Sequence, residues 1–297
     1  MRQNTLVHSF LLLLAAAIWG SAFVAQSVGM DYIGPFTFSA IRNTIGFIVL
    51  IPVSIWSRHA FPENSKGHRF GLSKQTVTGG IVCGVVLCAS SNFQQVGMIY
   101  TTVGKAGFIT ALYVVFVPVF GVFLRKKTGI RTWISVALAV IGLYLLCIRG
   151  TDLKLEYGDM LMLICAVLFA VHILSIDHFI GGADGVSMSC IQFFVTAVIS
   201  TVLMFVFEKP DADAINMSWI PILYAGVLSS GVAFTLQIIT QRHLKPVVAA
   251  LIMSMESVFS VISGWIVLGE VMSLRETAGC VFMFAAIILS QLPGRKK

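Results

Sequence analysis

The residue best suited to do chemistry in this sequence is Glu256, an acid at the centre of the apolar run LIMSMESVFSV, residues 251–261. An ionised group in apolar surroundings is costly unless it is paired or faces a polar cavity. A carboxylate held in such a place can bind a proton, a cation or the amine of a substrate. The alternative is a structural acid that is satisfied by a hydroxyl group or by Arg42.

Two other ionisable residues stand inside apolar stretches. Arg42 lies eight residues into the run 35–57, where a long side chain can extend toward the surface. For Arg42 we favour a structural ion pair or helix brace over substrate contact. His172 can titrate near neutral pH, although a single buried histidine is more often a hydrogen-bonded packing residue.

Aromatic and amide side chains complete the set of candidate site residues. Trp19 and Tyr113 can stack on a planar ligand or surround a cation, or simply pack. Asn92, Gln94 and Gln237 are amides in apolar segments, where each needs a hydrogen-bonding partner. A polar solute pathway and bonds between helices both satisfy that need, and the sequence does not choose between them.

The elements that carry these residues are predicted to be membrane-spanning helices. Hydrophobic residues make up 57% of the 297 residues, charged residues only 11%, and the mean hydropathy is +0.92; soluble domains contain about 25% charged residues. A helical span needs about 20 apolar residues, whereas a barrel strand needs about 10 with alternating polarity. The expected class is therefore an all-α integral membrane protein. Its ten predicted spans are 7–29, 35–57, 75–98, 102–124, 131–149, 159–181, 186–207, 218–241, 246–269 and 273–292.

Charge distribution predicts the orientation of these spans. If the N-terminus is cytoplasmic, 14 of the 20 Lys and Arg residues fall on the cytoplasmic side and five on the outer side, with Arg42 inside a span. This is the positive-inside pattern, so both termini are expected in the cytoplasm. The expected location is the plasma or inner membrane. The net charge of +7 is thereby explained without a nucleic-acid partner.

The two halves of the sequence resemble each other. With an offset of 150, Trp19 aligns with Phe169 and Arg42 with Gln192; with an offset of 143, Gln94 aligns with Gln237 and Tyr113 with Glu256. Five spans in each half is an odd number, so the second half must enter the membrane from the opposite side. An inverted repeat of this kind is common in secondary transporters, with the binding site near the midplane. We therefore expect two five-helix units, residues 1–150 and 151–297.

Several of these features together resemble a known family. Trp19-Gly20, Arg42, Glu256 and Gly269-Glu270, in this order and spacing, are similar to the EamA family of the drug/metabolite transporter superfamily. The resemblance covers the whole chain and implies a ten-helix carrier of small organic molecules that works by alternating access, often outward. Two departures leave the substrate open: Ser257 stands where members often have Pro, and Gly269-Glu270 has no counterpart in the first half.

Other classes of function lack sequence support. Leu228-Ser229-Ser230-Gly231 and Glu156-Tyr157-Gly158-Asp159 each lack the leading glycine of an intramembrane protease motif, and there is no HExxH or phosphate-binding loop. The six cysteines include no CxxC pair and are expected to pack. We therefore expect no enzyme, cofactor or metal, and uphill transport must use an ion or exchange gradient.

The leading hypothesis is a secondary-active exporter of small metabolites, amino-acid-like or related solutes or toxic compounds. Its partners are the solute, the lipid bilayer and protons as the candidate coupling ion, in a monomer or homodimer. Two alternatives remain: an importer of a scavenged nutrient or cofactor precursor, and a non-transporting membrane scaffold.

Overall fold

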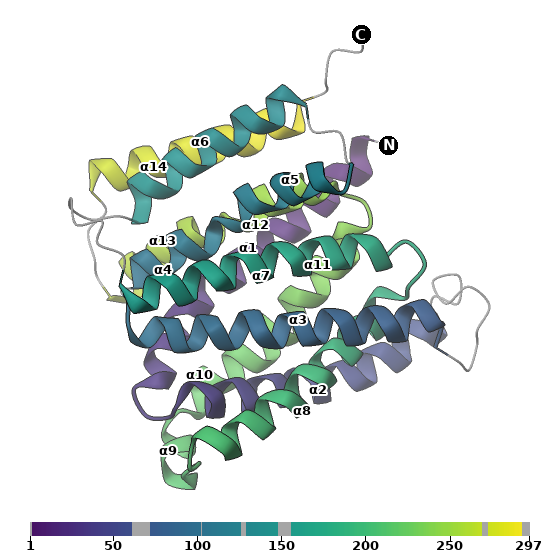
Figure 1. The fold of residues 1–297 in the computed structure, drawn as a ribbon, viewed down its shortest axis with the longest axis vertical. Helices are drawn as coiled ribbons and strands as arrows, with labels where there is room; N and C mark the ends of the chain where they lie inside the picture. Colours follow the sequence, from purple (N-terminus) through teal and green to yellow (C-terminus); the bar gives the residue numbers. More distant parts are fainter. Residues whose placement is uncertain are drawn as a thin grey trace.

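The computed structural model describes residues 2–60, 72–101, 103–125, 129–147, 156–268 and 273–292, and within these ranges the regular structure is helical, without strands. Most of the long helices lie side by side with roughly aligned axes, and α1 begins on the side of the molecule where α14 ends (Figure 1). The all-α class is confirmed.

Helices occupy all ten expected ranges. Seven of the ranges hold a single helix: α1 (Arg2–Met30), α2 (Pro35–Ala60), α3 (Lys74–Ile99), α6 (Ile130–Cys147), α7 (Tyr157–Phe179), α8 (Gly185–Phe207) and α14 (Leu274–Gln291). The other three ranges are interrupted. The range 102–124 contains α4 (Val103–Ala111) and α5 (Tyr113–Phe123), and the range 246–269 contains α12 (Pro246–Met253) and α13 (Glu256–Leu268). The range 218–241 contains α10 (Trp219–Leu223), η2 (Tyr224–Ala233) and α11 (Phe234–Gln241). A short helix, α9 (Ala212–Met217), precedes α10.

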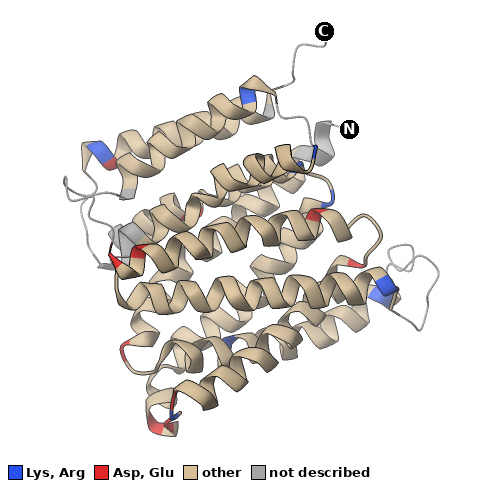
Figure 2. Cartoon of the chain, in the orientation of Figure 1, with Lys and Arg blue, Asp and Glu red and all other residues tan. Residues whose placement is uncertain are grey.

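Eight helical stretches of the described chain are long and apolar enough to cross a membrane. The expected fifth span contains a shorter apolar helix, Ile130–Leu146. The helix α14, in the expected tenth span, is neither among the eight candidate spans nor among the shorter apolar helices. The protein is therefore a multi-pass membrane protein with eight candidate spans. In Figure 2, Lys, Arg, Asp and Glu lie mainly near the ends of the helices, as expected when the middle of each helix faces hydrocarbon.

Two of the interruptions are tight turns inside an otherwise continuous span. At Leu112, the Val115 amide bonds to the Leu112 carbonyl at 2.9 Å, three residues back instead of four. At Ser254, the side-chain hydroxyl donates to the Leu251 carbonyl at 2.8 Å and competes with the backbone ladder. Such short tightened segments within a helix often mark hinges. Tyr113 and Glu256 each begin the helix that follows.

The third interruption is the ten-residue π-helix η2. It contains Gly226 and Gly231 and packs against α1 and α2. π-helical segments are rare and are frequently found at functional sites. Hydrophobic periodicity alone does not distinguish them from α-helix, so the sequence predicts a plain helix over 218–241.

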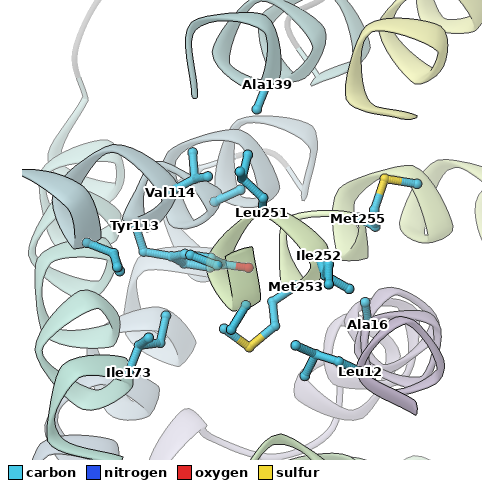
Figure 3. Packing of buried hydrophobic residues seen from close by; sticks show 14 of the residues in the cluster. Leu12, Ala16, Tyr113, Val114, Ala139, Ile173, Leu251, Ile252, Met253 and Met255 are labelled. Atoms are coloured by element: carbon cyan, nitrogen blue, oxygen red, sulfur yellow. The ribbon is translucent and has the colours of Figure 1, made fainter. Parts of the chain in front are cut away.

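Close helix contacts bring the elements of the core together. A Cβ atom at Gly20 of α1 would lie 2.5 Å from the Glu256 carbonyl oxygen, so only glycine allows α1 to approach α13 here. Likewise, a Cβ at Gly142 of α6 would lie 2.9 Å from the Gly279 carbonyl of α14. The main buried apolar cluster joins α1, α5, α7 and α12, and Figure 3 shows Tyr113 in it among Ile173, Leu251 and Met253.

Some predicted features lie outside the described residues. These are Gly269-Glu270, the boundary between the two expected units near residue 150, and part of the basic loops. Five of the six cysteines, Cys83, Cys88, Cys165, Cys190 and Cys280, are described and free; three are buried and two partly buried.

Candidate functional site

A pocket opens among the helices at the two tight turns and the π-helix. It contains about 550 Å³ of empty space, its open mouth included. Six of the eight residues proposed from sequence line it: Trp19, Arg42, Gln94, Tyr113, Gln237 and Glu256. They come from α1, α2, α3, α5, α11 and α13, so the fold brings residues from both halves of the chain to one place.

Glu256 and Tyr113 meet directly at this pocket. The Tyr113 hydroxyl donates a hydrogen bond of 3.1 Å to Glu256 Oε1, and the two side chains are only 4% and 7% exposed. Within the described part of the chain, the second carboxylate oxygen, Oε2, accepts no hydrogen bond. The acid therefore has one fixed donor and one oxygen available to a proton or a ligand.

Arg42 is not the partner of Glu256. Its Nη1 donates to Gln26 Oε1 at 2.9 Å, and its guanidinium lies 5.8 Å from the centre of the Phe38 ring. No described carboxylate forms an ion pair with it. The suggested Arg42–Glu256 pair is absent from the described structure because each residue bonds to a neutral neighbour instead.

Several polar atoms on the pocket wall lack partners among the described residues. They are Trp19 Nε1, Arg42 Nε and Gln237 Oε1, all on side chains less than a tenth exposed. The Trp19 ring packs edge-on against Phe234, which also lines the pocket. Buried polar groups are normally satisfied, so such atoms point to a ligand or water.

Two candidates lie away from this pocket. His172 is fully buried, its Nε2 is 2.8 Å from Gln192 Oε1, and it packs against Phe234 from outside the lining. Asn92 donates to the Cys88 carbonyl and to Ser200 Oγ, and it lines a second, more open cavity of about 910 Å³ beside α3, α7 and α8. Both bond to nearby protein groups, which was the alternative left open for them.

The sequence-based set missed other pocket residues. Gln26 is one, and the signal that it offered was an amide within the first apolar span. Thr110 and Ser229 also line the pocket, but hydroxyl groups are too common in membrane helices to stand out. The described residues contain no group of three or more His, Cys, Asp or Glu placed to hold a metal ion.

Taken together, the apolar helices and the pocket that they share define a multi-pass membrane protein built around a partly polar cavity. The model of the EamA-like transporter family matches residues 7–148 and 156–292. The chain therefore belongs to this family, part of the drug/metabolite transporter superfamily.

Relatives cover nearly the whole chain. An uncharacterized transporter of Archaeoglobus fulgidus is 29% identical over 95% of this chain and 84% of its own. The uncharacterized transporter YoaV of Bacillus subtilis is 21% identical over 92% of each chain. A solved crystal structure shares the fold, with a TM-score of 0.79 at 15% identity over 96% of both chains. The protein is thus a membrane transporter of small solutes, and its relatives carry the names of transporters, not of enzymes.

Proposed function

We propose that this protein is a secondary-active carrier that exports small organic metabolites, amino-acid-like or related solutes, by alternating access. The observation that carries the proposal is the shared pocket, where residues from both halves surround the Tyr113–Glu256 hydrogen bond. A cavity lined by aromatic rings with a few polar groups is typical of small-molecule sites. Glu256 is the proposed coupling residue, because a carboxylate with one free oxygen can take up and release a proton.

The proposed architecture is ten membrane helices in two inverted five-helix units, 1–150 and 151–297. Three observations support it. The Tyr113–Glu256 bond joins positions 143 residues apart, which is the repeat offset. The tight turns at Leu112 and Ser254 precede these two residues. Finally, α2 packs on α8 and α6 on α14, each helix against its repeat counterpart.

The proposed location is the plasma or inner membrane, with both termini cytoplasmic. The positive-inside pattern of the loops supports this orientation. In Figure 1 the start of α1 and the end of α14 lie on the same side of the molecule, which supports an even number of membrane crossings.

The transport assay uses purified protein in liposomes loaded with a defined mixture of amino acids and related metabolites, with an imposed proton gradient. We expect selected solutes to leave faster than from protein-free liposomes, as measured by mass spectrometry of the external medium. If no solute crosses in either direction, the carrier proposal fails and a scaffold role replaces it. Expression in auxotrophic cells separates the directions, because growth rescue at low nutrient supply favours an importer.

A further inference from the structure

We propose that Arg42 binds a carboxylate group of the transported solute, and that this solute has an apolar or aromatic body. The inference rests on the proposed function and names the substrate class of the same pocket. Arg42 is a buried cation, and no described carboxylate forms an ion pair with it.

The surroundings of Arg42 leave its charge uncompensated. The side chain is 6% exposed and lines the pocket, and its one hydrogen bond among the described residues goes to the neutral amide of Gln26. The Nε–H group has no acceptor among the described residues. A buried charge without a counter-charge is strongly unfavourable. An anion in the pocket would supply the missing charge and the missing acceptor.

A second unpartnered donor lies on the same pocket wall. Trp19 is 9% exposed, and its indole Nε1–H also lacks an acceptor in the described structure. A carboxylate offers two oxygens with about four acceptor sites, and its planar shape matches the guanidinium of arginine. These two unpartnered donors, on α1 and α2, therefore match an anionic ligand group, while the free oxygen of Glu256 in the same pocket remains for the proposed coupling proton.

The remaining residues of the pocket lining determine which kind of solute body can carry the carboxylate. Phe23, Phe169, Phe234, Ile173 and Met253 supply an apolar wall beside Arg42 and Trp19. Such a wall binds an apolar or aromatic body by burial of its surface. Gln237 Oε1, the unpartnered acceptor, is available to an N–H or O–H group on that body.

The test measures thermal unfolding of the purified full-length protein with three matched probes and a salt control. The probes are 3-phenylpropionate, the neutral 3-phenylpropionamide and the cationic 3-phenylpropylamine; sodium chloride at equal ionic strength is the control. We expect 3-phenylpropionate to raise Tm by about 2 to 4 °C at saturation. The amide, the amine and chloride should have smaller effects.

Variants assign the effect to Arg42. Arg42→Gln should weaken 3-phenylpropionate binding at least about tenfold, whereas Arg58→Gln, on the same helix but outside the pocket, should keep the response. Without probe, Arg42→Met should raise Tm, because it removes an uncompensated buried charge. A purely structural brace would instead lower Tm.

Several results overturn the inference: an equal response to the amide or chloride, no response to 3-phenylpropionate at millimolar concentration, or a response that survives in a folded Arg42→Gln variant. The wild-type comparison of carboxylate with amide remains decisive even if that variant does not fold. Failure here differs from failure of the proposed function, because the liposome assay detects transport of neutral or cationic solutes as well.

Discussion

At the scale of single residues, the Tyr113–Glu256 hydrogen bond connects the two halves of the chain inside the pocket. Tyr113→Phe keeps the ring and removes the donor, leaving Glu256 without its described hydrogen bond. Loss of a partner for a buried acceptor costs about 1 to 3 kcal/mol. We expect transport to fall roughly tenfold, the equivalent of about 1.4 kcal/mol, when rates are measured in liposomes.

The control for this variant is Tyr157→Phe, which removes a hydroxyl from a tyrosine that is 63% exposed. It should transport at the wild-type rate. If Tyr113→Phe also transports normally and with the same pH dependence, the hydrogen bond has no part in the mechanism.

Residue types alone indicated much of this site, because charged, amide and aromatic residues are conspicuous in apolar spans. They did not reveal which partner each residue has. Arg42 was expected to pair with an acid or brace a helix, and it bonds to Gln26. His172 and Asn92 each form a hydrogen bond away from the pocket, with Gln192 and Ser200, because a polar group in hydrocarbon bonds to whichever partner packing supplies.

At the scale of elements, the tight turn at Ser254 places Glu256 at the start of α13. Ser254→Ala removes the hydroxyl that bonds to the Leu251 carbonyl and introduces the strongest helix former. We expect a gain in stability of about 0.5 kcal/mol, seen as a higher Tm, together with slower transport because the hinge is stiffer.

Ser290→Ala is the matched change, since Ser290 makes the same type of bond to Ile287 at the far end of α14. It should alter Tm by a similar amount and leave transport unchanged. Equal transport rates in Ser254→Ala and the wild type would rule out a hinge role for this turn.

Helix positions were predictable from the sequence because span length and hydropathy are set by the bilayer. The turns and the π-helix were not, because they depend on backbone bonding that hydrophobic periodicity does not record. Ser254 is an ordinary residue in a membrane helix, and only its bond to Leu251 distinguishes it. The same limit applies to Gly20, whose role depends on a helix, α13, that is distant in sequence.

At the scale of the whole molecule, the proposed inverted topology places the loop after α1 and the loop after α7 on opposite sides of the membrane. Asp31 and Gly181 are exposed residues in these two loops. In intact cells, a membrane-impermeant thiol reagent should label Asp31→Cys and should label Gly181→Cys only after the membrane is opened. Labelling of both from outside would contradict the topology.

Glu256 is the residue proposed to couple solute movement to protons in the shared pocket. The most direct measurement is solute efflux from liposomes with and without a proton gradient, for the wild type and Glu256→Gln, with equal amounts of folded protein. We predict that the gradient accelerates efflux by the wild type, and that Glu256→Gln moves solute at a rate that no longer responds to the gradient. A Glu256→Gln variant that keeps the full wild-type response to the gradient would exclude Glu256 as the coupling residue.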